Sequence, residues 1–150
     1  MRINASEHES VAPELEQTLK DRLNNAPFPK FLGMNLEEVR KDYARMRVTY
    51  RDEMNQPAGI VHGGVMMSLI DTVVVSAILS NVPKIPERLV TIDAHTHFYN
   101  PVREQDMIAE AVVRKRGYKI VFLHTEVRTP DGTLVAEGSV SYKCVYGKEA

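Results

Sequence analysis

The longest apolar stretch of the chain runs from Val65 to Leu79 and predicts a helix buried on all sides. Four polar residues interrupt it, and their spacing places them along one stripe of that helix: Ser68, Asp71, Thr72 and Ser76. An ionised carboxylate is costly to bury without a partner. The stripe therefore indicates a functional surface, with Asp71 as its candidate reactive group.

Several stretches alternate apolar and polar residues with period two, which is typical of half-exposed strands. The clearest runs from Ala44 to Arg51, and residues 35–40 predict its partner across a turn at Lys41-Asp42. Further strands are expected at about 88–99, 105–116, 119–128 and 133–146, with Asp131-Gly132 as a hairpin turn. Strands in succession around one buried helix predict an α+β antiparallel architecture in a single domain, residues 1–150.

Residues 1–12 are polar, and we expect them to form a loose terminus. A helix should begin at Pro13, since Leu15, Leu19 and Leu23 form one apolar stripe, and the prolines at 27 and 29 should end it. The segment 28–33 would then lead into the sheet. Its Phe28 and Phe31 are expected to be core anchors, with lining of a substrate pocket as the alternative.

His62-Gly63-Gly64 lies where the central helix should begin. The first N–H groups of a helix have no intrahelical acceptor, and the helix dipole favours negative charge beside them. Since glycines have no side chain, a ligand oxygen can approach this backbone closely. A preorganised oxyanion site together with a carboxylate base or nucleophile is the minimum equipment for acyl transfer.

The two groups cannot meet within one chain. Nine residues separate His62 from Asp71, which along a helix means about 14 Å of rise and roughly half a turn of net rotation. If both act on one substrate, the donors come from one subunit and the carboxylate from another, across a two-fold axis. The spacing therefore predicts a dimer.

Composition narrows the function classes. With 150 residues, a net charge of −1 and a pI near 6.5, the chain gives no reason to expect a nucleic-acid partner or a membrane surface. Cys144 cannot form an internal disulfide, and zinc-type Cys/His spacing is absent, so we expect no metal. The first 15 residues do not have the pattern of a secretory signal, which favours a cytoplasmic location.

The pattern of Gln56, Gly59, His62-Gly63-Gly64 and Asp71 resembles the hotdog-fold acyl-CoA thioesterases, in particular the PaaI-like and hydroxybenzoyl-CoA thioesterase branches. The likeness extends from about Phe31 to Val145. It implies a curved antiparallel sheet wrapped around one long central helix, and dimers or tetramers with sites shared between subunits. It also implies an acyl-CoA substrate, with no cofactor.

Matched by position, the resemblance implies that Asp71 is the catalytic acid, that Gly63 donates its N–H to the thioester oxygen, and that Gln56 supplies a side-chain donor. PaaI-like members often have Asn six residues before the His, where this chain has Gln56, so neighbouring Asn55 is an alternative donor. Thr91 matches a Ser or Thr position that helps to hold the attacking water.

Other residues allow two interpretations. His62 is either a general base or, more simply, a cap that fixes the turn before the helix. Gly64 belongs to the same candidate oxyanion site. A basic group between two strands is either a solvated face or a binding site for the coenzyme A phosphates: Arg114, Lys115, Arg116 and Lys119.

Asp93, His95 and His97 share one strand face and resemble a row of metal ligands. A solvent-facing or interface row is the favoured interpretation, because a metal site needs further ligands and a closed geometry. Cys144 is expected to be a small buried apolar residue.

The favoured function is hydrolysis of an acyl-CoA thioester to free acid and coenzyme A. One alternative keeps the fold without the chemistry, as an acyl-CoA-binding module. The other is a hotdog hydratase or dehydratase, which normally pairs a His with an acid in a different local pattern.

Overall fold

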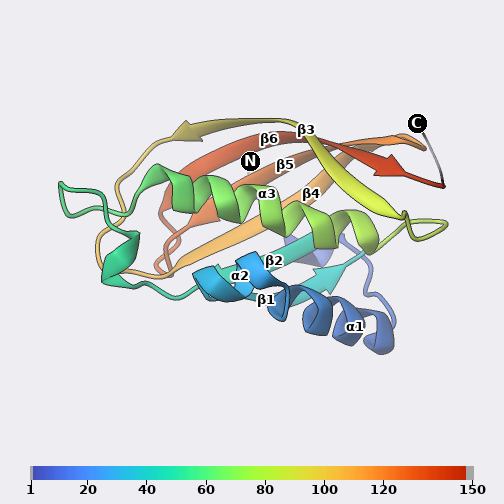
Figure 1. The fold of residues 1–150 in the computed structure, drawn as a ribbon, viewed down its shortest axis with the longest axis horizontal. Helices are drawn as coiled ribbons and strands as arrows, with labels where there is room; N and C mark the ends of the chain where they lie inside the picture. The colour runs from blue at the N-terminus through green and yellow to red at the C-terminus, as the bar shows by residue number, and fades with distance from the viewer. Residues whose placement is uncertain (1, 148–150) are drawn as a thin grey trace.

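The computed structural model describes residues 2–147 and shows a curved antiparallel sheet wrapped around one long helix (Figure 1). The central helix is α3 (Gly63–Leu79). The strands are β1 (Met34–Arg40), β2 (Tyr43–Val48), β3 (Arg88–Phe98), β4 (Met107–Arg116), β5 (Ile120–Arg128) and β6 (Leu134–Val145). This is the hotdog fold that the sequence predicted, with each strand end within a few residues of its expected position.

The sheet has the strand order β1-β2-β4-β5-β6-β3, and every neighbouring pair is antiparallel. The hairpin between β5 and β6 turns at Asp131-Gly132 as predicted, since Gly132 has φ of 91° and its N–H donates to the carbonyl of Thr129. Asp42 takes a positive φ of 60° at the turn between β1 and β2. Local turn residues therefore set the register of both hairpins.

Helix α3 lies across the concave face of the sheet because most of its side chains are apolar and have to be buried. Its contacts extend to every strand of the sheet. The helix packs tightly against β6 at Gly138, where an added Cβ would come within 2.6 Å of an Ile70 methyl group. The missing side chain at this position lets the helix seat against the sheet.

The N-terminal helix α1 (Pro13–Asn24) forms as predicted and buries Leu19 and Leu23. The entry into the sheet was predicted wrongly, because a second short helix, α2 (Pro27–Leu32), follows α1. Pro27 opens this helix, where a missing N–H costs nothing, and Gly33 ends it with a φ of 72°. The prolines thus separate two helices.

Residues 2–10, expected as a loose terminus, pack on the outer face of the sheet instead. They contain the short 3-10 helix η1 (Ala5–Glu7), and Ile3 is buried in a small cluster with Tyr43 and Val112. Ser10 forms a β-bridge with Arg40 at the edge of β1. The buried Ile3 and hydrogen bonds such as that from Lys41 N to the Glu9 carbonyl (2.8 Å) together hold this polar segment on the sheet.

Strand β3 forms the other edge of the sheet and is largely exposed on both faces. Ten of its eleven residues pair with β6, on one side only, and the register shifts at Ile92. A long edge strand with one unpaired side is a template for pairing with another chain. Within residues 2–147, none of the helices has the length and apolar character needed to cross a membrane.

Candidate functional site

Gln56 and Gly63, the two predicted oxyanion donors, line one hollow of about 320 Å³ at the start of α3. The loop before the helix is held by hydrogen bonds from His62 N to the Met54 carbonyl (2.8 Å) and from Gln56 N to the Ile60 carbonyl (2.8 Å). Gly63 N–H has no acceptor among the described residues. A carbonyl oxygen entering this hollow would therefore meet a free backbone donor.

The orientation of the Gln56 amide follows from its partner. Its Oε1 accepts the Ala58 N–H at 2.8 Å, so the other atom of the amide is Nε2, which has no acceptor among the described residues. The Phe98 ring closes the other side of the site, 3.2 Å from the position of a Cβ at Gly63. Gln56 and Gly63 thus offer two N–H donors to one space.

Asn55, the alternative donor, does not line this hollow. Its Nδ2 donates to the Tyr50 hydroxyl at 2.8 Å, and its Oδ1 is buried without a hydrogen-bond partner in the described structure. An amide whose donor already serves a protein hydroxyl is poorly placed to polarise a substrate carbonyl. The geometry favours Gln56.

His62 caps α3, which is the simpler of the two interpretations of this residue. Its Nδ1 accepts the Gly64 N–H at 2.8 Å, which leaves the ring proton on Nε2. Gly64 is therefore not a free donor, contrary to the expectation that it belongs to the oxyanion site. A Cβ at Gly64 would lie 2.9 Å from the His62 Nδ1, so glycine there is needed for the cap.

Asp71 lies eight residues along α3 and is held by two hydroxyl groups. Thr91 Oγ1 donates to its Oδ1 at 2.8 Å, and the Tyr142 hydroxyl approaches the same oxygen at 2.9 Å. The other carboxylate oxygen, Oδ2, has no hydrogen-bond partner among the described residues. One oxygen thus fixes the side chain, and the other is available to act on water or a carbonyl carbon.

Tyr142 is a site residue that sequence analysis missed. It lies directly opposite Thr91 in the pairing of β3 with β6, and its hydroxyl also lies 2.9 Å from the backbone carbonyl oxygen of Asp71. Burial, with the nearby Asp71 charge, raises the pKa of Tyr142 above its ordinary value, so the phenol stays a donor. The only sequence signal was a tyrosine at an inward position of the last strand.

The hollow beside Asp71 has a volume of about 330 Å³ and combines hydroxyl and apolar side chains. Its lining residues are Phe28, Met67, Ser68, Asp71, Thr72, Thr91 and Ala94. Phe28 and Phe31 are 52% and 71% exposed, so the prediction that they anchor the core was wrong. Helix α2 instead carries Phe28 to the edge of the space above Asp71.

The predicted basic residues line neither of these two hollows within one chain: Arg114, Lys115, Arg116 and Lys119. Arg116 donates from Nε to Asp42 at 3.1 Å and from Nη2 to the Ile78 carbonyl at 3.1 Å, at the far end of α3. Seventeen residues of helix separate the two ends, about 25 Å. Arg114 lines a different hollow beside Ile3, and Lys119 also has a protein partner.

Cys144 is buried as predicted, and burial raises the pKa of its thiol, which disfavours the reactive thiolate. Asp93, His95 and His97 are exposed on β3 and face away from α3, as expected for a solvent-facing or interface row. They are not part of the one His/Cys/Asp/Glu group within residues 2–147 whose ligand atoms lie close enough to hold an ion.

Comparison with known proteins identifies the family. The thioesterase superfamily model matches residues 58–136. The chain is 33% identical to a protein of Halobacterium salinarum that carries the name "putative esterase", over 71% of this chain and 73% of that one. It is 27% identical to the medium/long-chain acyl-CoA thioesterase YigI of Escherichia coli, over 77% and 84% of the two chains.

Solved structures agree with the fold. The PaaI protein of E. coli, from the phenylacetic acid degradation operon, superposes with a TM-score of 0.81 at 20% identity, covering 93% of this chain and 99% of that one. The thioesterase HI1161 of Haemophilus influenzae gives 0.79 at 21% identity, covering 89% and 92%. The chain therefore belongs to the thioesterase superfamily and is a thioester hydrolase.

Proposed function

We propose that this enzyme hydrolyses an acyl-CoA thioester at a site shared between two subunits. The observation that carries the proposal is that α3 has two half-sites, one at its start and one at Asp71. Each half-site contains part of the chemistry that the reaction requires. Gln56 and Gly63 offer donors at its start, whereas Asp71 presents a free carboxylate oxygen eight residues later. Eight residues correspond to about 12 Å along the helix, too far for one thioester carbonyl.

A second subunit related by a two-fold axis would bring opposite half-sites together. The exposed edge of β3 supports such pairing, because joining two β3 strands would extend the sheet and leave the two α3 helices antiparallel. The donors of one subunit would then face Asp71 of the other. A homodimer is thus the smallest active unit in this proposal, and a homotetramer would repeat it.

In the reaction, the Gly63 N–H and the Gln56 Nε2 donate to the thioester oxygen and stabilise the negative charge that develops there. Asp71 Oδ2 takes a proton from water as the water oxygen bonds to the carbonyl carbon. The carbon–sulfur bond then breaks, and the coenzyme A thiolate leaves with the proton. Direct attack by Asp71 would form a mixed anhydride that water must open, and this alternative uses the same geometry.

One feature supports the coenzyme A part of the substrate, and another supports its acyl group. The similarity to the acyl-CoA thioesterase YigI suggests this substrate class. The hollow beside Asp71 has apolar walls from Phe28, Met67 and Ala94, which suit an acyl chain or ring. Arg114 and Lys119 remain candidate phosphate contacts across the subunit boundary. A cytoplasmic location, where acyl-CoA esters are made and used, stays a prediction.

The test is a panel of acyl-CoA thioesters assayed with a colorimetric thiol probe, comparing wild type with Asp71→Asn. We expect turnover of at least one ester by the wild type, and a loss of about 100-fold or more in the variant. Asp21→Asn changes an exposed aspartate on α1, outside both hollows and away from the β3 edge, and is the matched control that should retain wild-type turnover.

Unchanged turnover in Asp71→Asn would remove this carboxylate from the mechanism. If no ester released thiol but acyl-CoA bound tightly, the alternative of a non-catalytic acyl-CoA-binding module would be favoured. Consumption of enoyl or hydroxyacyl thioesters without thiol release would favour the hydratase.

A further inference from the structure

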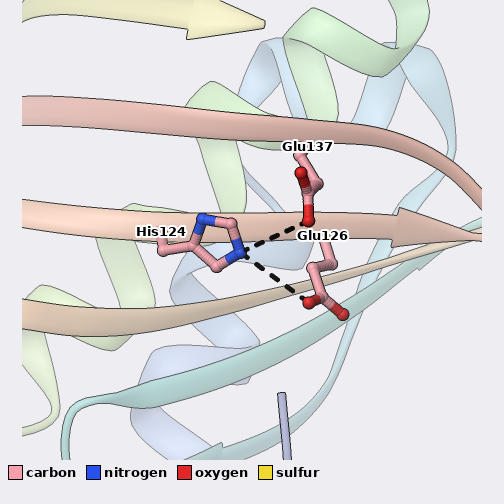
Figure 2. A group of neighbouring side chains, drawn as sticks. All are labelled: His124, Glu126 and Glu137. Atoms are coloured by element: carbon pink, nitrogen blue, oxygen red, sulfur yellow. Dashed lines mark ion pairs between the residues drawn. The ribbon is translucent and has the colours of Figure 1, made fainter. Parts of the chain in front are cut away.

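His124, Glu126 and Glu137 form a compact group on the outer face of the sheet (Figure 2). None of the three lines either hollow, although Tyr99, which lines the hollow at the start of α3, donates to Glu137. His124 and Glu126 come from β5 and Glu137 from β6. Thr125 lies between the first two and points toward α3, with its Oγ1 2.5 Å from the Cβ position at Gly138. Since side chains alternate along a strand, His124 and Glu126 face away from the helix.

The three ligand atoms surround a small space. The His124 Nε2 lies 3.7 Å from the Glu126 Oε1 and 3.9 Å from the Glu137 Oε1, and all three atoms lie within 4.8 Å of one another. These separations exceed hydrogen-bond length. They approach the spacing of about 3.3 Å between neighbouring ligands of a tetrahedral zinc ion at 2.0–2.1 Å.

Each carboxylate has one oxygen already held and the other turned to this space. The Glu126 Oε2 accepts from Arg128 (2.8 Å from Nη2) and from the Ile3 N–H (3.4 Å), whereas the Glu137 Oε2 accepts the Tyr99 hydroxyl at 2.6 Å. The remaining Oε1 atoms face the imidazole. Metal-binding carboxylates characteristically receive such outer hydrogen bonds, which fix their orientation.

The two carboxylates, Glu126 and Glu137, lie close enough that a cation between them would be stabilising. Glu126 and Glu137 are directly opposite in the pairing of β5 with β6, where like charges repel. Glu126 is 1% exposed, so water does little to screen this repulsion, and Arg128 contacts only the oxygen on its far side. A divalent ion between the two inner oxygens would relieve the repulsion and use the His124 nitrogen as its third ligand.

We propose that His124, Glu126 and Glu137 bind one divalent transition-metal ion per chain, of the zinc class. One imidazole and two carboxylates suit zinc better than magnesium, because magnesium prefers oxygen ligands in a strict octahedron. The His124 and Glu137 side chains are 23% and 29% exposed, which leaves the ion a path from solvent and a position for water. The site does not depend on the proposed thioesterase mechanism.

Calorimetric titration of the chelator-treated full chain with zinc alone tests the proposal. We expect one ion per chain with micromolar or tighter affinity, and weakening of at least about tenfold in each of His124→Asn and Glu137→Gln. Tyr99→Phe, which removes only the outer hydrogen bond to Glu137, should weaken binding by roughly tenfold. The matched control His95→Asn removes an exposed imidazole from the same face of the sheet and should leave the affinity unchanged.

Several results would overturn the proposal. No zinc binding by the wild type would show that the three side chains do not form a metal site. A loss in His95→Asn as large as that in His124→Asn would place the ion on the exposed histidine row. If the wild type bound magnesium as tightly as zinc, and His124→Asn kept that affinity, the imidazole would not be a ligand. The site would then be only a pair of carboxylates. Because thermal melts without metal show whether each variant folds, a folding defect is distinguished from a lost ligand.

Discussion

The hydroxyl of Tyr142 lies 2.9 Å from both the Oδ1 and the backbone carbonyl oxygen of Asp71, although the two residues are 71 positions apart. This contact joins the last strand of the sheet to the middle of the central helix. Together with the Thr91 hydroxyl it fixes one carboxylate oxygen and leaves the other available. The position of the proposed base or nucleophile is therefore set by the packing of β3 and β6 against α3.

Tyr142→Phe should reduce kcat with little change in KM, because the phenol orients Asp71 and does not line either hollow. Loss of a hydrogen bond to a charged group suggests a decrease of about 10- to 100-fold. Steady-state kinetics on the best acyl-CoA ester would measure it. A mainly increased KM would instead assign Tyr142 to substrate binding. Tyr146→Phe, at a tyrosine one residue beyond the end of β6, is the control.

Gln56→Ala should lower turnover by roughly 10- to 1000-fold, as expected when one of two oxyanion donors is lost. Asn55→Ala should cost less in turnover, because its amide faces the Tyr50 hydroxyl. Binding of a nonreactive thioether analogue should change little in Gln56→Ala. A larger kinetic loss in folded Asn55→Ala than in Gln56→Ala would show that the donor had been assigned to the wrong amide.

Mixing Asp71→Asn subunits with Gln56→Ala subunits should restore activity if sites are shared. Each mixed dimer would then have one pocket with both lesions and one intact pocket. After full exchange at equal amounts, about half of the dimers are mixed, so total activity should approach about one quarter of the wild-type value.

Native mass spectrometry of the mixture gives the fraction of mixed dimers. If each pocket used Asp71 and Gln56 of its own chain, every pocket would keep one lesion. Activity would then stay at the average of the two parents despite exchange, and the shared site would have to be abandoned.

Two buried tyrosines should make the fold sensitive to alkali. Burial is the main cause of a raised pKa in Tyr142 and Tyr43, with a further contribution in Tyr43 from its hydrogen bond to Glu110. Both therefore keep their protons in the folded protein at pH values where the unfolded chain loses them. The free energy of unfolding should be insensitive to these groups below about pH 10 and fall as pH rises above it.

The expected slope from each tyrosine is at most about 1.4 kcal/mol per pH unit. Urea unfolding between pH 8 and 11, compared among wild type, Tyr43→Phe and Tyr142→Phe, would measure it, with the exposed Tyr118→Phe as the control. Each buried variant should flatten the alkaline decline. An unchanged slope in both would show that other groups cause the sensitivity.

The sequence alone determined the elements whose signals are local. The apolar run of α3, the alternation of the strands and the turn at Asp131-Gly132 each depend on neighbouring residues, and all three were predicted correctly. The glycines after His62 and the carboxylate at Asp71 were recognised because they are unusual at the start and in the middle of an apolar helix. Their distance along the helix also led to the shared-site hypothesis.

The tertiary structure decided which partners these residues meet. Pairing of β3 with β6 placed Tyr142 beside Thr91 and Asp71, and pairing of β5 with β6 placed Glu137 opposite Glu126. Seating of the chain start on the outer sheet face buried Ile3, and the turn at Asp42 captured Arg116. Such contacts depend on strand register between segments far apart in sequence, and a shift of one residue would turn each side chain to the other face. Local patterns predict that a side chain is available, but only the register determines what it touches.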